Sequence, residues 1–136
     1  NLNEVLTLAS IIEKESSYSG EKARIAGVFY NRLKINMKLQ SDPTVIYSIF
    51  LKTGEKKAKL LKNDLKYLSA YNTYLHRGLP PGPICLPGLD SINAALHPVR
   101  TDELYFVADG AKRHIFSRTL KEHNKHVHHL RKGKSN

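Results

Sequence analysis

Apolar side chains open the chain in two stripes, each at the i, i+3, i+4 and i+7 or similar spacing that places them on one face of a helix. The stripes are Val5, Leu8, Ala9 and Ile12, then Ile25, Val28, Phe29 and Leu33. They predict a first helix that ends near residues 16–19 and a second that runs to about residue 36. Ser19 is expected to cap the second helix, and the short connection predicts an antiparallel pair.

Three further helices are predicted from their capping residues. Asp42 and Pro43 form a helix start, because an aspartate accepts from the free amides and a proline at the first position loses no hydrogen bond. Asp90 is expected to cap a short helix that stops before Pro98. Thr119 is expected to cap the last helix. This capping role by itself explains why Asp42 is present.

The remaining segments are predicted to be irregular or extended. Residues 51–66 are rich in lysine and fit a solvated loop or a short exposed helix. Residues 76–88 contain four prolines and three glycines, which favours a rigid extended loop. Residues 104–108 and 114–117 are β-rich and predict a hairpin. The chain is therefore expected to be one α+β domain over 1–136, mainly helical with a small β-hairpin.

The formal net charge of +10 raises the question of a nucleic-acid partner. Residues 52–66 and 112–134 together carry +11, so the rest of the chain carries −1. We therefore expect the binding cleft not to be basic. A nucleic-acid-binding module stays an alternative, although the chain shows no helix-turn-helix, zinc-finger or RNA-binding signature.

Metal and disulfide chemistry find little support in the sequence. Cys85 is the only cysteine, which excludes an internal disulfide and a cysteine metal site and favours a core or loop filler. Four histidines cluster near the end of the chain without a cysteine or carboxylate at ligand spacing, and they fit adventitious metal binding. They are His123, His126, His128 and His129. We expect no metal and no organic cofactor.

Two glutamates at the end of the first predicted helix are the candidates for catalysis. Glu13 and Glu15 fall on opposite edges of the apolar stripe, each roughly 80° from its centre, so a straight helix does not direct both into one cleft. Both could be half-solvated boundary residues. Glu15 lies in the last turn, where the helix dipole disfavours a negative charge by roughly 0.3–1 kcal/mol and raises the pKa towards that of a general acid. Geometry permits either residue, and the dipole favours Glu15.

Nearly the whole chain resembles the catalytic domain of the endolytic murein transglycosylases, also called YceG-like proteins. The segments that carry the resemblance, in order, are residues 9–16, 28–33, 39–47, 71–74, 78–82, 87–88, 94–98, 105–110 and 123–124. The resemblance implies a lysozyme-like fold, with Glu15 in the position of the essential glutamate. It also implies a structural or cleft-edge role for Asn31 and Arg32.

The resemblance implies a lyase that cleaves the MurNAc-GlcNAc β-1,4 bond of peptidoglycan glycan strands. It further implies that this chain is a fragment of a longer protein, anchored in the inner membrane with its catalytic domain facing the periplasm. No signal-peptide pattern opens the chain and no apolar run approaches the ~20 residues of a membrane span. Peptidoglycan synthases are candidate partners.

The expected mechanism uses one carboxylate. A glycosidase normally needs two, but here only Glu15 is well supported, which fits a lytic transglycosylase that forms 1,6-anhydromuramic ends. Glu15→Gln is expected to abolish cleavage with little change in thermal stability. The expected substrate-binding residues are Gln40, Asp42, Thr44, Tyr47, Tyr71, Asn72 and Tyr74. A wall-binding domain without catalytic activity stays an alternative.

Overall fold

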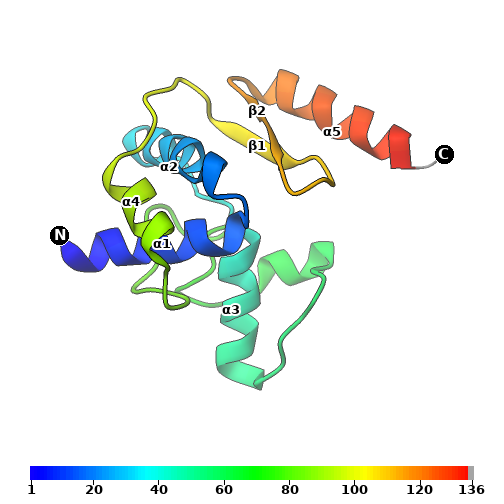
Figure 1. The fold of residues 1–136 in the computed structure, drawn as a ribbon. Helices are drawn as coiled ribbons and strands as arrows, with labels where there is room; N and C mark the ends of the chain where they lie inside the picture. The colour runs from blue at the N-terminus through cyan, green and yellow to red at the C-terminus, as the bar shows by residue number, and fades with distance from the viewer. Residues whose placement is uncertain (135–136) are drawn as a thin grey trace.

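A computed structural model describes residues 1–134. Its elements, in order, are α1 (Leu2–Glu15), α2 (Ser19–Lys34), α3 (Asp42–Thr53), the 3-10 helix η1 (Lys62–Lys66), α4 (Leu89–Leu96), β1 (Tyr105–Ala108), β2 (His114–Ser117) and α5 (Leu120–Lys134). The predicted α+β fold, mainly helical, is confirmed (Figure 1). None of the helices described in residues 1–134 is long and apolar enough to cross a membrane.

Helix α1 forms the centre of the core. Asn1 and Glu4 close a capping box at its start, which satisfies amides that would otherwise lack partners. Leu8 and Ile12 of the predicted stripe are buried, and the helix ends at Glu15, close to the expected end. The buried face extends further round the helix than the stripe, because Thr7, Ser10 and Ile11 are covered as well.

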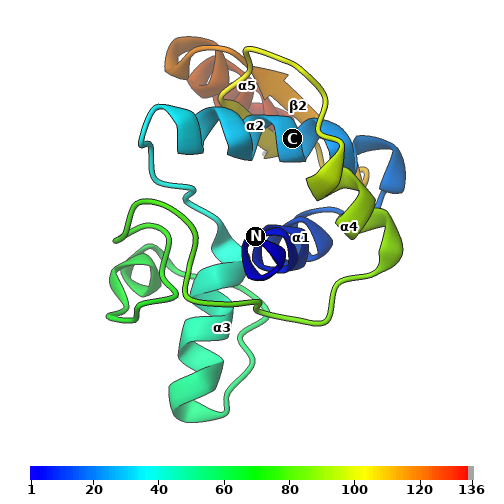
Figure 2. The ribbon, with the colours of Figure 1, turned by 90° about the vertical axis from the view of Figure 1, so that its left-hand side faces the viewer.

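The antiparallel packing predicted for α1 and α2 is wrong. In Figure 1, α1 runs across the view while α2 is seen nearly end-on, and Figure 2 reverses these orientations, so the two helices cross. Helix α4 packs against both. The chain after α4 then lies close on α2: a Cβ on Gly27 would come within 2.4 Å of the Val99 carbonyl oxygen. We attribute the crossing of α1 and α2 to their shared contacts with α4 and to this close contact at Gly27, and not to the short connection between them.

Three predicted caps lie one or two residues from the observed ones. Helix α3 is capped at Ser41, α4 at Gly88 and α2 at Tyr18, where the predictions named Asp42, Asp90 and Ser19. These observed caps make no side-chain hydrogen bond to the first turn, although Pro43 lies in the first turn of α3 and Glu13 of α1 accepts from the start of α4. The cap predicted at Thr119 is confirmed, because its Oγ1 accepts from the Glu122 amide at 3.2 Å.

The proline-rich loop (residues 76–88) runs without helix or strand, as predicted, and packs along α1. The Ile84 amide donates to Ser10 Oγ at 3.0 Å, and the Cys85 thiol donates to the Ser10 carbonyl oxygen at 3.3 Å. Asn3 Nδ2 reaches the Pro81 carbonyl oxygen at 3.5 Å. These contacts fix the loop beside α1, and Cys85 fills a partly buried position in it.

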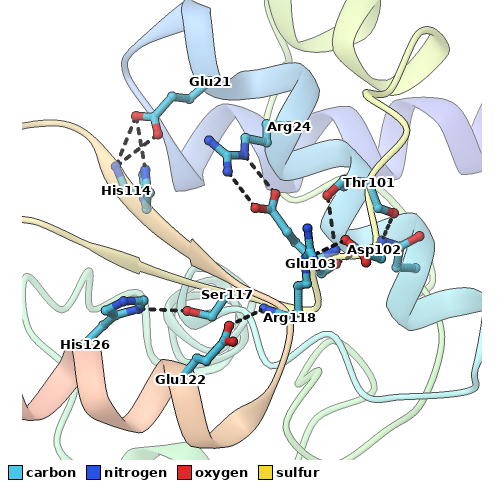
Figure 3. Close-up of polar contacts among 11 residues, drawn as sticks. Glu21, Arg24, Thr101, Asp102, Glu103, His114, Ser117, Arg118, Glu122 and His126 are labelled. Atoms are coloured by element: carbon cyan, nitrogen blue, oxygen red, sulfur yellow. Dashed lines mark hydrogen bonds and ion pairs between the residues drawn. The ribbon is translucent and has the colours of Figure 1, made fainter.

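The predicted hairpin is confirmed, with β1 and β2 antiparallel and Tyr105 opposite Ser117. Side chains of α2 hold it in place (Figure 3). Arg24 makes a two-pronged contact with Glu103, at 2.8 and 2.6 Å, and the Glu21 carboxylate accepts from the His114 amide at 3.1 Å. The hairpin therefore extends the helical core on its α2 side.

Helix α5 lies on the far side of the hairpin from α2 (Figure 1). Ser117 Oγ and His126 Nδ1 are 2.8 Å apart (Figure 3), and the His123 ring stacks on Tyr105 with ring centroids 5.2 Å apart. Two of the four clustered histidines thus have packing or hydrogen-bonding roles. Within residues 1–134, no three His, Cys, Asp or Glu side chains are placed as a metal site would require.

Candidate active site

Glu15 is the last residue of α1, and the end of that helix lies beside the start of α3 (Figure 1). Its side chain is half-buried. Ser41 and Asp42 approach it from the start of α3, and Arg32 approaches it from α2. Three elements distant in sequence therefore converge on one carboxyl group.

Burial in this environment raises the pKa of Glu15 to about 8. Desolvation is the largest cause, and the negative charge of Asp42 acts in the same direction. The Arg32 guanidinium and the Ser41 hydroxyl oppose the shift without cancelling it. At neutral pH Glu15 is therefore a neutral carboxylic acid with a proton to donate, which is the state a general acid requires.

Glu13, two residues earlier, has the opposite environment. Its Oε1 accepts from the Gly88 amide at 2.9 Å and from Ser91 Oγ at 2.8 Å, and Lys22 Nζ lies 3.7 Å away. The Gly88 and Ser91 hydrogen bonds are the main causes that lower the pKa of Glu13. Glu13 is thus an ionised residue that ties α1 to the first turn of α4. Of the two glutamates, Glu15 therefore has the environment that suits a general acid, whereas Glu13 is engaged with α4.

Asp42 brings a second carboxylate to the site. It is exposed, and its Oδ1 accepts from the Tyr74 hydroxyl at 2.6 Å. Burial, followed by the hydrogen bond to Asp42, raises the pKa of Tyr74, so Tyr74 keeps its proton and remains a donor. Two residues predicted to bind substrate therefore lie in direct contact beside Glu15.

Arg32 is buried and holds the backbone around the site. Its Nε donates to the Leu104 carbonyl oxygen at 2.7 Å and its Nη1 donates to the Leu39 carbonyl oxygen. Asn31 Nδ2 donates to the carbonyl oxygens of Thr101 and Glu103 at 2.7 and 2.9 Å. Both residues thus tie α2 to the chain that enters the hairpin, and Arg32 also places a positive charge near Glu15.

Thr44 is fully buried below the surface of the site. Its Oγ1 lies 2.8 Å from Thr73 Oγ1, and Thr73 Oγ1 in turn accepts from the Ser41 amide at 2.9 Å. The exposed Gln40 has a positive φ of 51° and donates its amide to the Thr73 carbonyl oxygen at 3.2 Å. Thr44 therefore supports the turn that presents Gln40, without reaching solvent itself.

Asn72 is also fully buried, and its amide group is satisfied by the protein. Its Nδ2 donates to the carbonyl oxygens of Leu65 and Tyr67 at 3.0 and 2.8 Å, and its Oδ1 accepts from the Tyr74 amide at 2.9 Å. The side chain organises the loop that carries Tyr74. The binding roles predicted for Thr44 and Asn72 stay predictions, and their burial limits them to action through this loop.

A pocket of about 310 Å³ lies along α3, and neither Glu15 nor Asp42 is among the residues that line it. Lys14 and Pro43, the chain neighbours of Glu15 and Asp42, line one part of it, and Tyr47 forms a wall. The Tyr47 ring meets that of Tyr71 edge to face, with centroids 5.1 Å apart. Tyr47 thus lines this pocket, and Tyr71 packs against Tyr47.

The expectation of a cleft that is not basic stays a prediction, because neither Glu15 nor Asp42 lines this pocket. Lys14, Lys56 and Lys57 all line the pocket. Two of them come from the loop after α3, which the sequence places in a basic segment but which folds back on α3. Sequence patterns missed these lysines, and also Ser41, because their contacts join segments that no local pattern relates.

Comparison with known proteins identifies relatives of this arrangement. The sequence of residues 1–129 matches the model of the YceG-like family. A protein of Bacillus subtilis (strain 168), named endolytic murein transglycosylase, is 49% identical over 125 residues, which cover 92% of this chain and 34% of the relative. A Streptococcus pneumoniae (serotype 2, strain D39) protein of the same name is 38% identical over 129 residues, which cover 93% of this chain and 23% of the relative.

A crystal structure gives the same result for the fold. A putative yceG-like protein from Listeria monocytogenes has 49% sequence identity and a TM-score of 0.82, over 91% of this chain and 38% of that one. This chain thus spans about a third or less of the curated relatives that it matches.

Proposed function

This chain belongs to the YceG-like family, and we propose that it is the catalytic part of a peptidoglycan lytic transglycosylase. The proposed reaction cleaves the MurNAc-GlcNAc β-1,4 bond and leaves a 1,6-anhydromuramic end. The observation that carries the proposal is the half-buried Glu15, whose pKa of about 8 keeps it protonated at neutral pH. The names of the relatives support the reaction class.

Glu15 has both proton transfers in the proposed mechanism. It donates its proton to the glycosidic oxygen as the bond from that oxygen to C1 of the muramic residue breaks. The muramic 6-hydroxyl then attacks C1, and the ionised Glu15 accepts the hydroxyl proton. The bond from O6 to C1 replaces the broken bond, and Glu15 regains its starting state. No water is consumed and no second acid is required.

The neighbours of Glu15 suit the charges that develop during this reaction. Arg32 lies near enough to stabilise the Glu15 carboxylate that forms after the first transfer. The Asp42 carboxylate, oriented by Tyr74, faces the positive charge that builds at C1 in an oxocarbenium-like transition state. Both groups are held by hydrogen bonds before substrate arrives, which is how preorganised groups lower a barrier.

Substrate binding is proposed at the exposed and half-buried residues of this region. Gln40, Asp42 and Tyr74 present polar groups for sugar hydroxyls, while Tyr47 and Tyr71 offer ring surface. Thr44 and Asn72 position these residues from below. The substrate would be met outside the cytoplasm, where peptidoglycan lies. Membrane anchoring and contact with peptidoglycan synthases are proposed on the family resemblance alone.

Identification of the new chain ends tests the proposal. The full-length protein is incubated with purified peptidoglycan glycan strands, and the fragments are analysed by mass spectrometry. We expect 1,6-anhydromuramic ends at every cleaved bond. If the folded full-length protein binds the strands but does not cleave them, the chain is a wall-binding domain instead.

A muramidase is the second candidate function, because Asp42 supplies the second carboxylate that hydrolysis needs. In that reaction Asp42 would activate a water molecule or attack C1, and every cleavage would leave a reducing muramic end. The same mass spectra separate the two reactions, because an anhydro end is lighter by one water. Predominantly reducing ends would assign the protein to the hydrolases.

A further inference from the structure

The pocket of about 310 Å³ forms a groove along α3, which begins at the chain neighbours of Glu15 and Asp42. Pro43, Ile46, Tyr47 and Phe50 line it from a single face of that helix, and the proline-rich loop contributes Cys85 to the pocket. Seven residues of helix separate Pro43 from Phe50, which corresponds to about 10 Å along the axis. The groove thus leads away from Glu15 over a mostly apolar floor.

Two lysines of this groove have no negative partner. Lys57 is neutralised, because its Nζ lies 2.9 and 2.8 Å from the two carboxylate oxygens of Asp64. Lys14 and Lys56 are exposed, and neither forms an ion pair with an acidic residue among residues 1–134. The Lys57 contact also anchors the loop after α3, which holds Lys56 at the groove. The groove is therefore apolar below and positively charged at its edge.

This combination does not match the sugar backbone of the proposed substrate. The linked sugars of peptidoglycan carry no charge once the muramic carboxyl is joined to its peptide, so they offer nothing for two cations. The stem peptide on that carboxyl has alanine methyl groups and free carboxylates. Three extended residues of such a peptide span about 10 Å, which is the length of the groove.

On the basis of the function proposed above, we propose that the groove along α3 binds the stem peptide of the muramic residue at the cleavage site. The peptide lies on the apolar floor, and its carboxylates face Lys14 and Lys56. The enzyme would then select strands that carry peptides over strands from which peptides have been removed. None of the residues that shift the pKa of Glu15 belongs to this pair of lysines.

Paired substrates test this selection. The full-length protein is given intact glycan strands and the same strands after removal of their peptides by an amidase. We expect kcat/KM to be higher for the intact strands. Lys14→Met with Lys56→Met should reduce that preference about tenfold, through KM, as expected for the loss of two exposed charge contacts. Lys59→Met, an exposed lysine of the same loop that does not line the pocket, should preserve the preference.

A binding measurement separates this proposal from the proposed reaction. Calorimetry compares a GlcNAc-MurNAc disaccharide that carries a stem peptide with the same disaccharide without peptide. Stronger binding of the peptide form, lost in the double lysine variant and in high salt, supports the groove even if the protein cleaves nothing. Equal binding of both disaccharides, or a preference that survives the double variant, overturns it. Lys56→Met alone, in an exposed loop, provides the same comparison if the double variant fails to fold.

Discussion

The two faces at the end of α1 hold the same side chain in opposite chemical states. On the α4 face, Glu13 accepts hydrogen bonds from an amide and a hydroxyl and lies near Lys22, and these contacts lower its pKa. On the α3 face, Glu15 is desolvated beside another carboxylate, and its pKa is raised to about 8. Glu13 is thus an ionised residue that links α1 to α4, and Glu15 is a protonated residue that can donate its proton.

The difference shows that tertiary partners, and not the residue type or the helix, decide the role of a carboxylate. Both residues lie in the last turn of α1, so the helix dipole acts on both in the same direction. The donors around Glu13 outweigh its desolvation, so its pKa is lowered. Ser41 and Arg32 do not outweigh the desolvation of Glu15, which therefore keeps the proton that the proposed reaction uses.

Activity should separate the two residues most strongly. Glu15→Gln removes the proton donor and is expected to lower the rate of glycan cleavage by about 10³-fold, within the usual range for a general acid. Glu13→Gln keeps the donor in place and is expected to lower the rate only by a few-fold. The rate of release of anhydromuramic fragments measures both. Equal losses, or the larger loss at Glu13, would assign the acid to the wrong face.

Stability should show the reverse order. Replacement of Glu13 by glutamine weakens charged hydrogen bonds at a partly exposed position and is expected to cost about 1–2 kcal/mol. Glu15 destabilises the folded state when ionised, because its folded pKa lies above its ordinary value of 4.5. The contribution of Glu15 to the free energy of unfolding is therefore most favourable below pH 4.5, where it is protonated in both states. This contribution falls as the pH rises and is lost once the pH passes the folded pKa of about 8.

Glu15→Gln is therefore expected to exceed the wild type in stability at pH 9 by about 3–5 kcal/mol, the upper figure being the full pKa shift at about 1.36 kcal/mol per unit. At pH 4 the two proteins should be nearly equal, since Glu15 is then protonated in both the folded and the unfolded chain. Thermal unfolding at the two pH values gives this difference, and Glu13→Gln serves as the control. A Glu15→Gln variant that is less stable at pH 9 would mean that the carboxylate has stabilising partners.

The pH profile should change when Asp42 is altered. The wild-type kcat/KM is expected to fall as pH rises above about 8, where Glu15 loses its proton. Asp42→Asn removes a charge that raises the pKa of Glu15, so this alkaline limb should move to lower pH. Burial remains the larger cause, so the limb should stay above pH 4.5. An unmoved limb would exclude electrostatic coupling between Asp42 and Glu15.

The smallest effect is expected at Tyr74. Tyr74→Phe removes the hydroxyl that donates to the Asp42 carboxylate but leaves the ring, and the loss of this hydrogen bond at an exposed carboxylate corresponds to about a threefold to tenfold change in kcat/KM. The pKa of Glu15 should remain high, because burial is its main cause. Steady-state kinetics and the pH profile measure both. A change larger than that of Glu15→Gln would make Tyr74 the proton donor.

The spacing of apolar residues and the positions of capping, proline and glycine residues predicted the helices and strands more reliably than the packing between them. The end of α1 near Glu15, the hairpin, the irregular loop at 76–88 and the cap at Thr119 are all confirmed. These features depend on a few neighbouring residues, so a local pattern contains the information. The crossing of α1 and α2 depends on α4, which lies more than fifty residues later in the chain.

The candidate site shows the same division. A helical wheel placed Glu13 and Glu15 symmetrically, and the donors that distinguish them come from Gly88 and Ser91. Asp42 was interpreted as a helix cap, whereas its carboxylate accepts from Tyr74, thirty-two residues away. Each error concerns a contact between distant segments, which no local pattern records.

The proline-rich loop gives the site a preformed wall. The fixed φ angles of its four prolines reduce the conformational freedom of the unfolded chain. The entropic cost of ordering this segment is therefore small and is already met when substrate binds. A stem peptide that binds against such a wall loses less affinity than one that must first order a mobile loop. Turnover by this protein should accordingly be limited by bond cleavage or release of the strand, with no closing motion of this segment in the cycle.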